Sequence, residues 1–357
     1  MRVLVTGHNG YIGSVMTNVL KQQGHTVIGL DTDYFADCTL FEDRPSVDGA
    51  IRKDIRDVVP GDLEGIDAIV HLAALSNDPL GDLDADLTSD INHRASVNLA
   101  KMARDAGVSR YLYSSSCSMY GSGGDESLSE EAEFHPQTPY AISKVCTEED
   151  LNKLADASFS PVYMRNATAY GVSSRLRADI VLNNLVCWAV TTGEVKIMSD
   201  GMAWRPIVHI EDISRIFAAA LVAPREQIHN QAFNVGVNSD NYRVRELAEI
   251  VRDTVPGSTV VFSGDRSADT RSYRVDFSKV ASTFSTTPFI WNARLGAQEL
   301  FQTLSKVGLK LEDFQGRRYI RLHQLRMLMD SKTIDSDLRW VCIEPDNPDS
   351  IGELQGV

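Results

Sequence analysis

The chain has 357 residues, of which 43% are hydrophobic and 24% charged, a composition typical of globular proteins. Its length suits one larger domain with a smaller appended one, and a core of that size needs no disulfide or metal to stabilise it. The net charge of −14 disfavours nucleic acid and anionic membranes as partners, because both would be repelled at long range. Any phosphate group must therefore be held by a local arrangement of donors.

The five cysteines are scattered along the chain without a CxxC pair. Their odd number and spacing favour reduced thiols over a disulfide framework or a zinc site, so we expect no metal. The sequence begins directly on an apolar run, and it contains no stretch of about eighteen consecutive apolar residues. We therefore expect a cytoplasmic protein without a membrane-spanning segment.

Residues 1–31, MRVLVTGHNGYIGSVMTNVLKQQGHTVIGLD, organise the rest of the chain. An apolar run meets Gly7, Gly10 and Gly13, and apolar residues at helical spacing follow. A second apolar run then ends at Asp31. This pattern predicts a βαβ unit, in which a pyrophosphate approaches the glycine turn and binds at the helix N-terminus.

Asp31 lies at the tip of the second predicted strand, where dinucleotide-binding units contact the adenosine ribose. Its carboxylate can accept hydrogen bonds from both ribose hydroxyls and would repel a 2′-phosphate. No arginine follows in Asp31-Thr32-Asp33-Tyr34, so the sequence predicts NAD in preference to NADP. The alternative is a purely structural glycine turn, but strand, turn, helix and acid all occur here at the spacing that NAD binding needs.

Two further segments are candidates for cofactor contacts. In one, Asp54 can accept a hydrogen bond from the adenine amino group and Ile55 can pack against the ring, although a loop with a buried isoleucine would look the same. In the other, a buried strand, DAIVHL, ends in small residues that let the backbone lie against a cofactor. The candidates there are Leu72, Ala73 and Ala74.

A hydroxyl-rich turn, SSSCSMYG, follows the predicted strand over residues 110–113. Ligands of parallel α/β proteins bind beyond the carboxyl ends of the strands, so chemistry is expected at such an end. Before this strand, residues 84–106 predict a long helix that carries Asn92. After it, a polar loop leads to another helix, which opens with HPQTP.

Tyr140 and Lys144 lie four residues apart on that second helix and therefore on one face of it. An ammonium beside a phenol favours the phenolate and lowers the tyrosine pKa from its usual value of ~10. The pair is thus a candidate acid/base. An isolated YxxxK pattern is more often a solvent-facing pair, but here it follows a nucleotide-binding unit and a serine-rich strand end.

Taken in order, the motifs TGHNGYIG, Asp31, Asp54-Ile55, HLAA, SSSCSMYG, PYAISK and RNATAYG resemble those of the extended short-chain dehydrogenase/reductases that act on nucleotide sugars. The resemblance is closest to the UDP-galactose 4-epimerase-like branch and covers about residues 1–290. It implies an α/β fold: a Rossmann doubly wound parallel sheet that holds NAD, and a smaller C-terminal α/β domain for a nucleotide-diphosphate sugar. The implied cofactor contacts are Gly7, Gly10, Tyr11, Ile12, Gly13, Asp31, Asp54, Ile55, Leu72, Ala73, Ala74, Asn92, Ser114, Tyr140 and Lys144.

The resemblance also implies contacts with the nucleotide sugar. Asn166 matches an asparagine that touches the diphosphate or the sugar, and Asn183 begins the helix beneath the nucleotide. Arg205, in the run WRPIVHIED, matches an arginine that reaches the phosphates. Arg266 and Asp269, in RSAD, match residues on the pyrophosphate and the ribose. Either arginine alone would be read as a solvated surface charge, but the two together favour a phosphate clamp.

By the same resemblance, Tyr140 is the acid/base, Lys144 stabilises its phenolate, and Ser116 hydrogen-bonds the reacting oxygen. Cys117 and Ser118 would line the sugar groove, where most 4-epimerases have alanine and threonine and related 4,6-dehydratases have carboxylates. The sequence therefore favours an NAD-dependent epimerase that oxidises a sugar hydroxyl, at C4, and reduces the ketone on its opposite face. The alternatives are a nucleotide-sugar oxidoreductase, a dehydratase of the same family, and a non-catalytic NAD-binding regulator.

For the domain organisation, we expect an NAD-binding domain over residues 1–171 with a return segment over 207–237. A substrate domain is expected over residues 172–206 and 238–310, and an extension over 311–357. The extension carries an amphipathic stretch, YIRLHQLRML, that either packs on its own domain or forms a partner site.

The family resemblance also implies a homodimer, in which the helices near residues 84–106 and 137–156 form a four-helix interface. The sequence itself shows only that both helices are long enough for this. Arg175 and Arg177 add positive charge to a loop expected over the nucleotide, and they are candidates for selecting the nucleotide or the sugar.

Overall fold

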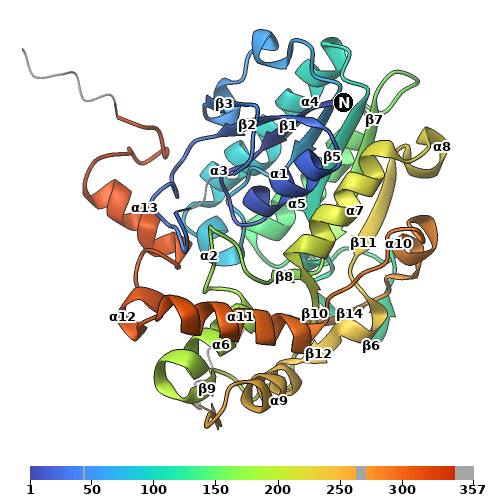
Figure 1. The fold of residues 1–357 in the computed structure, drawn as a ribbon. Coiled ribbons are helices and arrows are strands. Elements are labelled where there is room, and N and C mark those ends of the chain that lie inside the picture. The colour runs from blue at the N-terminus through green and yellow to red at the C-terminus, as the bar shows by residue number, and fades with distance from the viewer. Residues whose placement is uncertain (43–44, 263–270, 342–357) are drawn as a thin grey trace, which may run out of the picture.

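The computed structural model describes residues 1–42, 45–262 and 271–341. Its larger domain is built on a seven-stranded sheet in the order β11-β7-β5-β4-β1-β2-β3, in which all neighbours run parallel (Figure 1). The strands are β1 (Arg2–Thr6), β2 (Thr26–Asp31), β3 (Gly49–Arg52), β4 (Ala68–His71), β5 (Arg110–Ser116), β7 (Ser160–Asn166) and β11 (Gln231–Val235). The strand order reverses between β1 and β4, so a crevice for ligands opens at their carboxyl ends.

Helices cover both faces of this sheet, which explains why its central strands are apolar on both sides. Val3, Leu4 and Val5 of β1 are all fully buried, with Val3 and Val5 facing one helix layer and Leu4 the other. The first layer contains α1 (Gly13–Gln22) and α7 (Ile210–Val222), and the second contains α4 (Ala95–Asp105) and α5 (Pro139–Asn152). The doubly wound α/β fold expected from the sequence is confirmed.

The helical segment predicted over residues 84–106 is interrupted. It consists of α3 (Ala85–Thr88), a π-helical turn (Ser89–Arg94) and α4. Such π-turns inside helices are rare and frequently occur at functional sites. The turn carries Asn92, whose buried side chain accepts a hydrogen bond from the backbone N–H of Leu75 at 2.8 Å.

The smaller domain lies beneath the carboxyl ends of the sheet in Figure 1. Its core is formed by helices α6 (Val181–Thr192), α9 (Val244–Thr254) and α11 (Ala293–Val307). Three small sheets complete it. One consists of β8 (Thr168–Tyr170), β10 (Trp204–His209) and β12 (Asn241–Arg243). The other two are strand pairs, β9 (Glu194–Ile197) with β13 (Thr259–Phe262) and β6 (Ser122–Leu128) with β14 (Ser272–Val275). The remaining short helices are α2 (Asp78–Gly81), α8 (Arg225–Ile228), α10 (Ser278–Thr283) and α12 (Leu311–Phe314).

The amphipathic stretch near the C-terminus forms α13 (Arg321–Asp330). Leu325 and Leu328 are buried in the same apolar cluster as α4 and α5, so α13 packs on the larger, sheet-containing domain. Among the described helices, none is both long enough and apolar enough to cross a membrane.

Candidate active site

A cavity of about 690 Å³ runs between the carboxyl ends of the sheet and the smaller domain. Most of the residues that the sequence predicts for cofactor, catalysis or substrate line this one cavity. They are Gly7, Gly10, Tyr11, Ile12, Gly13, Asp31, Asp54, Ile55, Leu72, Ala73, Ala74, Ser114, Ser116, Ser118, Tyr140, Lys144, Asn166 and Arg205. The structure therefore brings segments from both domains to a single site.

The glycine turn after β1 is shaped for close approach. Gly7 has a φ of +72°, and a Cβ there would lie 2.9 Å from the backbone nitrogen of Ala73. A Cβ at Gly13 would lie 2.1 Å from the carbonyl oxygen of Gly7. No side chain caps the N-terminus of α1 at Ile12, which leaves that end available to an anion. The turn thus fits the pyrophosphate of a dinucleotide.

Asp31 lines the cavity at the end of β2, and its carboxylate is oriented by two backbone donors. These are the N–H groups of Asn9, at 3.0 Å, and of Asp33, at 2.9 Å. Burial raises the pKa of Asp31 above its usual range, and the two N–H groups oppose this shift by stabilising the anion. Both groups hold the carboxylate at the position where an adenosine ribose is expected.

We expect NADP to bind about a hundredfold or more weakly than NAD, because its 2′-phosphate would meet the Asp31 carboxylate as a like charge. Asp31→Ser should reduce this difference, as measured by calorimetric titration with both cofactors. Asp37→Ser is the matched control, since Asp37 is exposed, lies outside the cavity and carries the same charge. Equal dissociation constants for the two cofactors in the unmodified protein would contradict the prediction.

Asp54 lines the same end of the cavity, but its carboxylate is already engaged. Arg56 donates to it from Nε at 3.1 Å and from Nη2 at 2.7 Å. Burial alone would raise the pKa of Asp54, but the hydrogen bonds and charge of Arg56 lower it overall. Ile55 beside it is buried. An adenine contact by Asp54 would therefore be shared with this ion pair, a feature that the sequence did not predict.

Tyr140, Lys144 and Ser116 meet at the middle of the cavity. Lys144 Nζ donates to the carbonyl oxygen of Ser114 at 2.7 Å and lies 5.6 Å from the centre of the Tyr140 ring. A side-chain hydrogen bond joins Tyr140 to Ser116. Helix α5 places Tyr140 and Lys144 one turn apart, and β5 delivers Ser116 at its carboxyl end. A hydroxyl group of a ligand beside Ser116 would thus face a tyrosine that a lysine supports.

The expected lowering of the Tyr140 pKa is not found in the structure. Burial raises the pKa of Tyr140 to about 12, and the nearby Asp78 adds to this, against an opposing hydrogen bond from Ser116. Burial also lowers the pKa of Lys144 to about 7, so its ammonium is only partly populated at neutral pH. Sequence spacing gives the proximity of the pair but not its desolvation, which dominates both values.

Three lining residues beyond the catalytic group have buried polar atoms that find no hydrogen-bond partner among the described residues. One is Arg321 Nη1, and the other two, Asn166 Oδ1 and Ser118 Oγ, lie near the catalytic residues. Asn166 is held in place by its amide nitrogen, which donates to Ser114 Oγ at 3.1 Å. Buried polar atoms without partners are costly, so both indicate a polar ligand at this end of the cavity. A sugar or its phosphates would meet this requirement.

Several basic residues that line the cavity escaped the sequence analysis as site candidates. Arg271, Lys196 and Arg321 all line it. Arg271 forms an ion pair with Asp78, while Arg205 donates to the carbonyl oxygen of Arg271. Arg271 lies two residues after the RSAD run and two before Tyr273, and this position could have identified it as a candidate. Lys196 and Arg321 had no such signal, because tertiary packing alone brings them here.

Three residues predicted as contacts do not line the cavity. Cys117 is buried in the core, and its thiol donates to the carbonyl oxygen of Arg165 at 3.1 Å. Asn183 is fully buried and donates to Tyr11 Oη at 2.9 Å. Asn92 orders Leu75 instead of lining the cavity.

For Cys117 and Asn183 the cause is the side of the backbone that each residue occupies. Cys117 follows Ser116 directly and so faces away from it, and Asn184, the neighbour of Asn183, lines the cavity in its place. Burial also raises the pKa of the Cys117 thiol, which makes it a poor base. The predicted contacts Arg266 and Asp269 lie outside the described residues.

The fold and the cavity together define an NAD-dependent enzyme of nucleotide-sugar chemistry. The chain belongs to the NAD-dependent epimerase/dehydratase family, whose model matches residues 3–236. It is 30% identical over 302 residues to the UDP-glucose 4-epimerase of Mycolicibacterium smegmatis, which covers 81% of this chain and 94% of that protein. NAD is therefore the cofactor, and the glycine turn and Asp31 fit it.

Solved structures agree with this assignment. MoeE5, in complex with UDP-glucuronic acid and NAD, superposes with a TM-score of 0.74 at 26% identity and covers 86% of this chain and 99% of its own. DesIV, a dTDP-glucose 4,6-dehydratase from Streptomyces venezuelae with NAD and TYD bound, has a TM-score of 0.73 at 25% identity and covers 86% and 97%. A dehydratase thus shares this architecture, while the sequence relative is an epimerase, so the reaction has to be argued from the site.

Proposed function

We propose that this protein is a nucleotide-sugar 4-epimerase, with a nucleoside-diphosphate hexose as its substrate. The observation that carries the proposal is the chemistry of the cavity wall. Tyr140, Lys144 and Ser116 stand together there, and none of the described lining residues is a glutamate, a histidine or a cysteine. Such a wall supports oxidation of a hydroxyl group and return of the hydride, and it offers few groups for any further proton transfer.

Tyr140 is the acid/base of this reaction. Its phenolate takes the proton from the sugar C4 hydroxyl, while Ser116 donates a hydrogen bond to the same oxygen. NAD, when bound, supplies the acceptor for the hydride that leaves C4. In its ammonium form, Lys144 stabilises the phenolate through its positive charge, and the carbonyl oxygen of Ser114 orients that ammonium. In the second half of the reaction, Tyr140 returns the proton after the keto sugar has turned its other face to the cofactor.

The acidic residues of the cavity are unsuited to the extra step of a dehydratase. The four in the described wall are Asp31, Asp54, Asp78 and Asp179. The two nearest to the sugar end are paired with guanidinium groups, Asp78 with Arg271 and Asp179 with Arg177. Burial alone would raise the pKa of Asp179, but Arg177 lowers it overall, so this carboxylate stays ionised and is a poor proton donor. Elimination of water needs an acid and a base at neighbouring carbons, whereas epimerisation needs Tyr140 alone.

The test is the conversion of UDP-glucose, and then of a panel of dTDP-, GDP- and CDP-sugars, by the NAD-loaded protein without added reductant. We expect one substrate to form its C4 epimer with unchanged mass, as followed by NMR and mass spectrometry. A product lighter by 18 mass units would show a dehydratase. NADH accumulating in proportion to product would show an oxidoreductase, and either result would overturn the proposal.

A further inference from the structure

The C-terminal segment lies against the adenosine end of the cavity. We call residues 321–341 the C-terminal strap. Figure 1 shows its helix α13 at the side of the larger domain, and the family model ends well before it, at residue 236. Tyr34 Oη donates to the carbonyl oxygen of Leu338, and Trp340 Nε1 donates to that of Thr32 at 2.8 Å. Since Thr32 and Tyr34 line the cavity, the strap is fastened to its wall.

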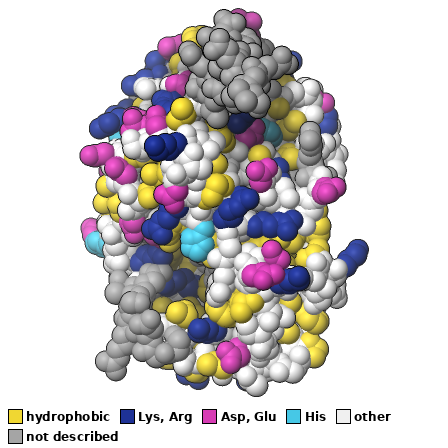
Figure 2. Space-filling view, turned by 90° about the vertical axis from the view of Figure 1, so that its left-hand side faces the viewer, with side chains coloured by type: hydrophobic (Ala, Val, Ile, Leu, Met, Phe, Trp, Pro, Cys, Tyr) yellow, Lys and Arg dark blue, Asp and Glu magenta, His cyan; other side chains and the backbone are white. Residues whose placement is uncertain are grey.

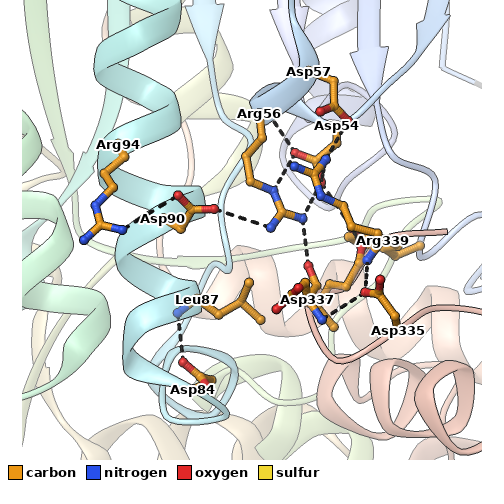
Figure 3. A network of polar contacts seen from close by, with 12 residues as sticks. Asp54, Arg56, Asp57, Asp84, Leu87, Asp90, Arg94, Asp335, Asp337 and Arg339 are labelled. Carbon is orange, nitrogen blue, oxygen red and sulfur yellow. Dashed lines mark hydrogen bonds and ion pairs between the residues drawn. The ribbon is translucent and has the colours of Figure 1, made fainter.

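A second set of contacts fastens the strap to the segment after β3, as Figure 3 shows. Arg339 pairs with Asp57 at 2.5 Å and with Asp54 at 3.5 Å. In return, Arg56 donates to the carbonyl oxygen of Asp337 at 2.8 Å. Asp54 is the lining residue placed at the adenine, so the network joins the strap directly to the cofactor site.

Arg321, the first residue of α13, reaches the cavity from the strap. It lines the cavity, yet it is only 2% exposed. Its guanidinium lies 4.5 Å above the ring of Phe35, and Nη2 donates to the carbonyl oxygen of Arg175 at 2.7 Å. Nη1 has no hydrogen-bond partner among the described residues. The side chain is therefore held in place, with the two N–H donors of Nη1 unpartnered among the described residues.

The charges around Arg321 do not neutralise it. Arg175 and Arg177 are close enough to oppose its positive charge, and the nearby Asp179 already pairs with Arg177. The thiol of Cys38 is adjacent, but burial raises its pKa, so it stays neutral. Burying a cation without its own counter-ion is unfavourable, and an anionic ligand would offset that cost. Figure 2 shows this side of the molecule, with Lys and Arg side chains across the middle of the face.

We propose that Arg321 binds the pyrophosphate of NAD, and that the C-terminal strap thereby completes the cofactor site from outside the matched family region. The doubly negative pyrophosphate is the anion that the glycine turn of the same cavity is built to receive, and the planar guanidinium suits phosphate oxygens. The tethers at Tyr34 and Asp54 hold the strap over the cofactor. This inference concerns cofactor binding and is independent of the reaction that the sugar undergoes.

The test compares Arg321→Met with Arg326→Met in the full-length chain, freed of endogenous nucleotide. Arg326 lies on the same helix but is exposed, so it is the matched control. Calorimetric titrations use NAD, ADP-ribose, which retains the pyrophosphate, and adenosine, which lacks it. We expect Arg321→Met to weaken binding of NAD and ADP-ribose by about ten- to a hundredfold and to leave adenosine binding unchanged. Arg326→Met should change none of the three.

Unchanged NAD affinity in folded Arg321→Met would overturn the proposal, and so would an equal loss for adenosine, because that loss cannot come from phosphate contacts. If Arg321→Met does not fold, Arg321→Lys decides. Lysine keeps the buried charge but lacks the fork that reaches both the Arg175 carbonyl oxygen and a phosphate. We then expect NAD affinity to fall about threefold or more at constant adenosine affinity, and equal NAD affinities would refute the assignment.

Discussion

Replacing Tyr140 with phenylalanine is expected to lower kcat for epimerisation by about 10²–10⁴-fold, the usual contribution of a positioned acid/base. Phenylalanine keeps the Cβ that lies against Gly81 and the ring that lies beside Lys144, so the cavity keeps its shape. Affinity for NAD should therefore change little. Steady-state kinetics and calorimetric titration with NAD measure the two effects separately.

The matched control is Tyr242→Phe. This variant also loses a hydrogen-bonded tyrosine hydroxyl group, whose partner is Asp240, but Tyr242 lies outside the cavity. The kcat of Tyr242→Phe should stay within about twofold of the kcat of the unmodified enzyme. The variant should stay folded, because a partly exposed hydroxyl group contributes at most about 1 kcal/mol to stability. Comparable kcat values for Tyr140→Phe and Tyr242→Phe would exclude Tyr140 as the acid/base.

The glycine turn and Asp31 could be located from sequence because local rules determine them. A turn that needs positive φ at Gly7, and an acid at the end of the next strand, leave a fixed spacing in the chain. The same holds for Tyr140 and Lys144, which helical geometry places on one face. The positions of such residues in the site are set mainly by the secondary structure in which they lie.

The features of the site that could not be predicted from the sequence depend on tertiary packing. Cys117 and Ser116 are neighbours in the chain, yet only Ser116 faces the cavity, and no local pattern distinguishes them. Arg321 reaches the cofactor end only because α13 docks against the larger domain. The pKa values of Tyr140 and Lys144 depend on burial, which spacing does not reveal.

One buried ion pair beneath the catalytic residues is expected to have the largest effect on stability. Glu148, one turn after Lys144 on α5, accepts hydrogen bonds from Arg165 Nη2 at 2.7 Å and from its Nε at 3.1 Å. Both side chains are only 7% exposed. Arg165 also donates to the carbonyl oxygen of Glu130, so it joins β7 to the loop behind the active site.

Glu148→Gln should lower the free energy of unfolding by about 3–5 kcal/mol, because it leaves the Arg165 guanidinium buried without its counter-ion. The exposed neighbour Glu149 provides the control, and Glu149→Gln should stay within about 0.5 kcal/mol of the unmodified protein. Urea unfolding followed by circular dichroism measures both. A loss below about 1 kcal/mol for Glu148→Gln would show that Arg165 finds another partner.

The free energy of unfolding that is lost in Glu148→Gln should depend on pH. Burial lowers the pKa of Lys144 to about 7 in the folded protein, and the charge of Glu148 opposes that shift. The unfolded chain therefore binds more protons than the folded one between about pH 7 and the ordinary lysine value, and the free energy of unfolding rises with pH across that window. Below about pH 7, Lys144 of the folded protein is a charged ammonium that Glu148 stabilises. Above about pH 7, Lys144 is a neutral amine that gains nothing from Glu148. The deficit of Glu148→Gln should thus be larger at pH 6 than at pH 8, and an equal deficit at both would show that Glu148 acts on Arg165 alone.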